Sequence, residues 1–90
     1  MSVGKLYSVP DRLLVTRVRY RILEESPNGW AGIFVPADVA RVKDGGRYIV
    51  ELEDRRVGYC GTRVDASRQG TFRFGGKRLE EAARPGVTSR

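Results

Sequence analysis

The sequence predicts a mainly β protein, either a small, strongly bent sheet or a partly closed five-stranded barrel, with one short helical turn and a C-terminal helix. Two observations favour this class. Short segments alternate apolar and polar residues, and turns rich in glycine, proline, aspartate and asparagine separate them closely. The 90 residues suffice for one small core, so we expect a single domain over residues 1–90, with flexible ends at 1–10 and 86–90.

Five strands are expected, in chain order at residues 13–23, 30–35, 47–53, 57–64 and 71–74. The first alternates most regularly, with apolar residues on one face and Arg17, Arg19 and Arg21 on the other. The loop at residues 24–29 joins the first two strands into a hairpin, because Asn28-Gly29 supplies the geometry of a tight turn.

Two short helical segments are expected as well. Residues 36–46 predict a helix or helical turn, since Pro36 suits a first helical position and Asp38 complements the N-terminal dipole. Residues 77–84 predict a terminal helix that stops at Pro85.

The aromatic residues predict the core. Six of them fit the inward phase of their strands: Tyr20, Phe34, Tyr48, Tyr59, Phe72 and Phe74. Trp30 stands apart, because it begins a strand directly after a loop. It is either a plug at the end of the barrel or an exposed contact for a partner chain, and both interpretations stay open.

The composition argues against catalysis and against a metal or cofactor. The chain has no His and one cysteine, Cys60, so it lacks the commonest general base and any zinc ligand set. The lone cysteine and the lack of a long apolar segment predict a cytoplasmic protein without a membrane partner. The net charge of +6 attracts polyanions, although 14 of the 17 basic residues are Arg, a bias that GC-rich coding also produces.

Alternating arginines indicate a nucleic-acid-binding face. Alternate residues of a strand lie roughly 6.5–7 Å apart, close to the phosphate spacing of an extended nucleic-acid strand, and exposed Tyr7 or Trp30 could stack on bases. Glu51 and Glu53 offer an alternative, because they could pair with the arginines across the sheet and cancel the local potential. The residues proposed for this face are Arg17, Arg19, Arg21, Arg63 and Arg73.

The segment "DASRQG" at residues 65–70 permits another ligand. With Arg17 and Arg21 it resembles the motifs of the PilZ family, which implies a cyclic di-guanylate site completed by a loop of Asp65, Ser67 and Gly70. An ordinary turn is the favoured interpretation, because turns also select these residue types and three expected strands separate the two motifs.

Three longer segments carry a family resemblance: "GIFVPADVARV", "YIVELEDRRVGYCGTRV" and "GTFRFGGKRLEEAARPGV". In their order they resemble a small bacterial β-barrel domain of unknown function, found alone or beside OmpD-associated domains. The similarity covers residues 14–87 and implies a barrel fold. It implies nothing about chemistry.

We therefore expect a non-enzymatic, basic β-barrel binding module that contacts nucleic acid through its arginine-lined strand face. One alternative is a protein–protein or self-association module, a homo-oligomer that uses an unpaired edge strand or Trp30. The other is the cyclic-dinucleotide receptor.

Overall fold

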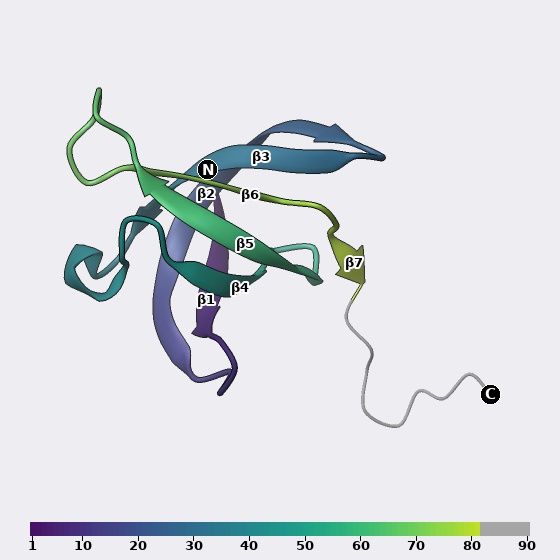
Figure 1. Cartoon of the computed structure of the whole chain (residues 1–90), viewed down its shortest axis with the longest axis horizontal. Coiled ribbons are helices and arrows are strands. Elements are labelled where there is room, and N and C mark those ends of the chain that lie inside the picture. The colour runs from purple at the N-terminus through teal and green to yellow at the C-terminus, as the bar shows by residue number, and fades with distance from the viewer. Residues whose placement is uncertain (82–90) are drawn as a thin grey trace.

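Strands dominate the computed structural model, which describes residues 1–81 (Figure 1). Along the chain the elements are β1 (Ser2–Ser8), β2 (Leu14–Ser26), β3 (Gly29–Pro36), the 3-10 turn η1 (Val39–Arg41), β4 (Arg47–Glu51), β5 (Arg56–Val64), β6 (Phe72–Gly76) and β7 (Glu80–Glu81). The expected helical turn is confirmed in shorter form, and the Asp38 carboxylate accepts a hydrogen bond from the Ala40 amide at its start.

Six of these strands close into a barrel. Their order is β4-β1-β2-β3-β6-β5, and the pairing of β4 with β5 joins the two ends of the sheet. Every pairing is antiparallel. The prediction of a small barrel is thus confirmed, whereas the expected five strands and partial closure are wrong for the described residues.

The missing strand is β1, which lies in the segment expected to be a flexible end. It pairs with β2 on one side and β4 on the other, so it completes the barrel. Its crowded position explains Gly4, since a Cβ there would lie 2.6 Å from the Glu51 carbonyl oxygen. The expected flexible end at 86–90 lies outside the described residues.

The expected C-terminal helix is also wrong over its described part. β7 pairs with Arg56 and Val57 of β5, so the chain after β6 continues along the same strand. Two contacts favour this course over a helix. Leu79 packs against the core, and Gly58 makes room for the Arg78 carbonyl, which would lie 2.3 Å from a Cβ at that position. Residues 82–84 of the expected helix lie outside the described residues.

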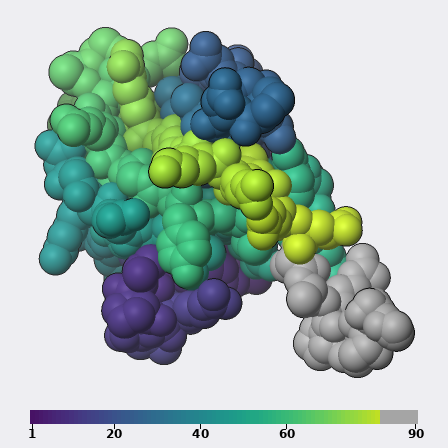
Figure 2. All heavy atoms as spheres, turned by 45° about the vertical axis from the view of Figure 1, so that its right-hand side comes forward, coloured from purple at the N-terminus to yellow at the C-terminus, as the bar shows by residue number. Residues whose placement is uncertain are grey.

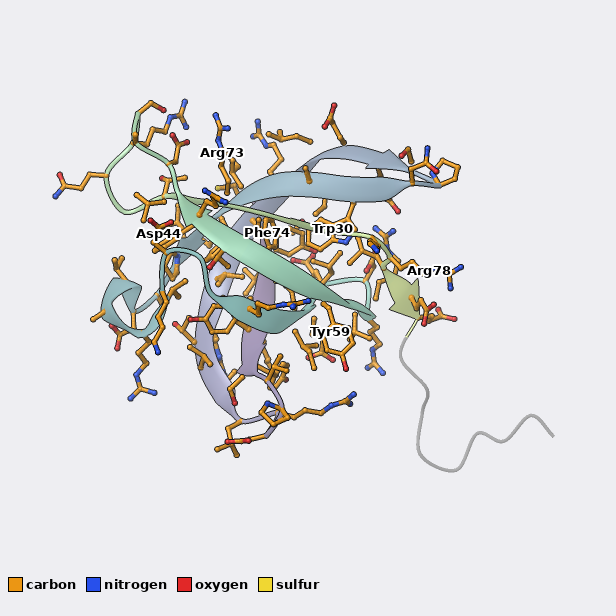
Figure 3. The ribbon with its side chains drawn as sticks, in the orientation of Figure 1. Trp30, Asp44, Tyr59, Arg73, Phe74 and Arg78 are labelled. Carbon is orange, nitrogen blue, oxygen red and sulfur yellow. The ribbon has the colours of Figure 1, made fainter. Side chains whose placement is uncertain are left out.

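The core is aromatic at its centre. Phe34 is fully buried and stacks on Phe72 with ring centroids 5.3 Å apart. Phe74 lies 4.9 Å from Phe34 and meets the Trp30 ring edge-on, also at 4.9 Å (Figure 3). Tyr20 and Tyr48 are buried as predicted. The Phe and Trp contacts connect β3 with β6, and the ring of Tyr20 on β2 meets that of Phe74 edge-on at 6.5 Å.

Tyr59 contradicts its predicted inward position. Its side chain is 59% exposed, while Cys60 and Thr62 of the same strand are buried. The interior beside β5 is filled by large rings from neighbouring strands, so small residues face inward there. The Thr62 hydroxyl is satisfied by donating to the Lys43 carbonyl at 2.6 Å.

Burial of Cys60 gives a direct chemical prediction. Burial raises the pKa of its thiol from 9.0 to about 12. We expect iodoacetamide to spare the native protein at a pH between these values and to alkylate it rapidly in denaturant, as mass spectrometry would show. The pKa of this thiol is higher in the folded state than in the unfolded state. Its contribution to the free energy of unfolding is therefore fully present below pH 9.0 and is lost progressively up to about pH 12. Rapid labelling of the native protein would contradict the assigned burial.

Within residues 1–81, no helix has the length and apolar character needed to cross a membrane.

Candidate functional site

The three arginines of β2 lie on the outside of the barrel. Arg17, Arg19 and Arg21 are exposed, and the residues between them, Val18 and Tyr20, are buried. The predicted alternation is therefore confirmed over residues 16–22, whereas Leu14, expected on the inward face, is 50% exposed. The spacing of the guanidinium-bearing positions follows from strand geometry, at roughly 6.5–7 Å between alternate residues.

Strand pairing brings two further arginines into line with β2. Arg21 lies opposite Ile33 of β3, and Ile33 lies opposite Arg73 of β6. Arg73 in turn lies opposite Arg63 of β5. Three arginines thus form one row across four adjacent strands, and Arg73 lies on the outside of the sheet (Figure 3). We call Arg17, Arg19, Arg21, Arg63 and Arg73 the arginine surface.

No carboxylate among residues 1–81 forms an ion pair with this surface. Glu51 accepts a hydrogen bond from the Tyr7 hydroxyl at 3.1 Å, and Glu53 accepts one from the Val3 amide at 2.8 Å. Neither forms an ion pair with an arginine among residues 1–81. The ion pairs of this part of the chain are Arg41–Asp38, Arg56–Glu25, Arg56–Asp54 and Arg78–Glu80. Directly opposed like charges such as Arg63 and Arg73 destabilise a sheet, so the row has a cost for folding.

The "DASRQG" segment forms a self-contained turn between β5 and β6. The Asp65 carboxylate accepts hydrogen bonds from the Ser67 hydroxyl at 2.7 Å and the Ser67 amide at 3.0 Å. These hydrogen bonds, followed by weaker attraction from Arg73 and Arg68, lower the pKa of Asp65. Gly70 adopts a φ of 80°, the left-handed conformation that favours glycine in turns.

The turn and the two arginines of the expected ligand motif do not contact one another. Arg17 and Arg21 lie on β2, which β3 separates from the loop that leads into β6. Within the described chain, neither Asp65 nor Ser67 forms a hydrogen bond or ion pair with them.

Trp30 is a plug at the end of the barrel. Its side chain is 5% exposed, so it is not available as an exposed contact or stacking surface. Its indole N–H is buried and has no hydrogen-bond partner among the described residues.

A wide groove of about 1000 Å³ lies on another part of the outer surface and was not predicted. Tyr7, Ile49 and Tyr59 line it from β1, β4 and β5. Figure 2 shows this side of the molecule, with the N-terminal segment (purple) and the segment ending in β7 (yellow) flanking the green and teal strands. The groove was missed because Tyr59 was predicted to point inward. The alternation of Tyr59, Gly61 and Arg63 along one strand is the signal that would have placed Tyr59 on the outer face with Arg63.

Comparisons with protein-family models, with curated proteins and with solved structures find no match for this chain. The resemblance drawn from the sequence is supported as far as a small closed β-barrel, and the named family is not.

Proposed function

We propose that this protein is a non-enzymatic, basic β-barrel binding module that contacts nucleic acid through the arginine surface. The proposal rests on the row of Arg21, Arg73 and Arg63. No carboxylate of the described chain forms an ion pair with these three arginines. The lone buried Cys60 is compatible with a cytoplasmic setting, which forms part of the proposal.

Phosphodiester recognition accounts for the chemistry of this row. The arginine fork can donate two parallel hydrogen bonds to a phosphate, which makes arginine better suited than lysine to this task. Arginines that repel one another when unbound gain from a polyanion that bridges them. A row that costs stability is therefore more easily understood as a binding surface than as a structural feature.

The salt dependence of binding tests the proposal. We expect a fluorescent oligothymidine to bind at low salt. A length of about 15 nucleotides is enough to fill the single-strand binding site of a typical small barrel. Each phosphate contact should contribute about 0.7 to the slope of log affinity against log salt concentration. Fluorescence anisotropy measures both quantities. The proposal is refuted if the oligonucleotide fails to bind at low salt or if its affinity does not change with salt.

Two alternative functions, self-association and cyclic-dinucleotide binding, have tests of their own. Self-association could use β2 beyond Tyr20, because pairing with β1 ends at Ser2 and leaves that edge open in the described chain. Sedimentation would reveal it as a concentration-dependent dimer. Binding of cyclic di-guanylate that is abolished by Asp65→Ala would instead favour the receptor.

A further inference from the structure

The groove combines aromatic and apolar groups in one cross-strand row. Tyr7 lies opposite Ile49, and Ile49 lies opposite Tyr59. Ile49 is 8% exposed and lines the groove between these two tyrosines. The hydroxyl of Tyr7 is held by Glu51, whereas the ring of Tyr59 is largely open to solvent. The groove therefore presents an exposed aromatic face above an apolar floor.

The rim of the groove is basic. Four cationic and two acidic side chains line it, which leaves an excess of two positive charges: Arg12, Arg47, Lys77 and Arg78 against Glu51 and Glu80. Arg78 forms an ion pair with Glu80 at 3.2 Å, and Glu51 accepts a hydrogen bond from the Tyr7 hydroxyl. Arg12, Arg47 and Lys77 form no ion pair within residues 1–81. An anionic occupant complements this rim, and a second copy of this basic chain does not.

The groove is continuous with the arginine surface. Tyr59, Gly61 and Arg63 alternate along β5, and Gly61 lies opposite Gly75 of β6. Both glycines line the groove, so neither β5 nor β6 places a side chain between the arginines and the ring of Tyr59. The step from Arg63 to Tyr59 is four residues of one strand, roughly 13–14 Å, a span that an extended nucleic-acid chain covers with few nucleotides.

We propose that the groove holds unpaired bases of single-stranded nucleic acid, with one base stacked on Tyr59, while the phosphates cross Arg63 and Arg73. This inference rests on the proposed function and specifies its ligand. Stacking on an aromatic side chain requires a base whose face is open. A duplex buries those faces in its own stack, so it can use the arginine surface alone.

Tyr59→Ala tests the stacking contact. We expect it to weaken binding of the oligothymidine by roughly 5- to 150-fold and to leave both the salt slope and the affinity for a duplex of equal length unchanged. Tyr59→Phe keeps the ring and should bind as the wild type does. Val64→Ala, at an exposed residue of the same strand, is the matched control.

Gly61→Leu tests the groove by filling it. A Cβ at this position meets its nearest neighbour, the Gly46 carbonyl oxygen, at 3.9 Å, so the fold has room for the change. We expect selective loss of oligothymidine binding, with duplex binding and the thermal midpoint retained.

The outcomes separate the two proposals. If the wild type binds the single strand and the duplex equally, or if Tyr59→Ala and Gly61→Leu both bind the single strand normally, the groove is not a base site although the arginine surface stands. If neither nucleic acid binds at low salt, the proposed function itself fails. Dimerisation that Gly61→Leu abolishes would assign the groove to a second copy of the chain and overturn the inference.

Discussion

Replacing Arg63 and Arg73 together with glutamine is expected to weaken binding of single-stranded nucleic acid roughly 10- to 30-fold at about 0.1 M salt. The slope of log affinity against log salt should fall by about 1.4, since each lost phosphate contact removes about 0.7. Glutamine keeps a similar length and can still donate hydrogen bonds, so the change isolates the charge. Unlike the Tyr59 variant, this double variant should weaken duplex binding as well.

Misfolding would not explain such a loss. The two side chains are exposed and lie directly opposite one another, so removing their repulsion should leave the thermal midpoint unchanged or raise it. Circular dichroism during heating provides that check before any binding is measured.

The matched control is the double variant of Arg41 and Lys43, both replaced with glutamine. Each double variant lowers the net charge from +6 to +4, but the control residues lie in and beside η1 and do not belong to the arginine surface. We expect the control to bind nearly as the wild type does, apart from a small long-range electrostatic effect. Equal losses in the two double variants would show that net charge, and not the row across β5 and β6, determines the affinity.

The parts of the fold that the sequence predicted are those with strong local signals. β2 was predicted because its alternation extends over many residues, and the helical turn because Pro36 and Asp38 are residue types typical of a helix start. β1 was missed because its inward residues are Gly4 and Leu6, and a glycine gives no hydrophobic signal. The need for that glycine arises from the neighbouring strand β4, which the local sequence does not reveal.

The site was predictable in part for a related reason. Alternation placed the arginines of β2 on one face, but their alignment with Arg63 and Arg73 depends on the order β2-β3-β6-β5. That order results from pairing between distant segments. The phase of β5 was assigned from the large side chain of Tyr59, whereas the crowded interior selects the smaller Cys60 and Thr62. A tertiary constraint overrode the local pattern, and the groove was missed along with it.

Phe34→Ala should lower the free energy of unfolding by about 3–5 kcal/mol. Phe34 is fully buried between the rings of Phe72 and Phe74, at centroid distances of 5.3 and 4.9 Å. Truncation of its side chain leaves a cavity that the neighbouring strands of a closed barrel fill only in part. Small domains have a total stability of roughly 5–15 kcal/mol, so this single change removes a large part of it.

Chemical denaturation measures this effect, and Val35→Ala is its control. Val35 is the next residue of β3 but is 38% exposed, so its truncation should cost far less. Comparable losses in the two variants would contradict the position of Phe34 at the centre of the core.

Phe34→Ala also links packing to binding. Phe34 lies opposite Tyr20 and Phe72, one position along from the row of Arg21, Ile33 and Arg73. A barrel loosened at Phe34 should hold these arginines less firmly in register. Phe34→Ala should therefore weaken nucleic-acid binding even at temperatures below its unfolding midpoint. Val35→Ala should bind as the wild type does under the same conditions.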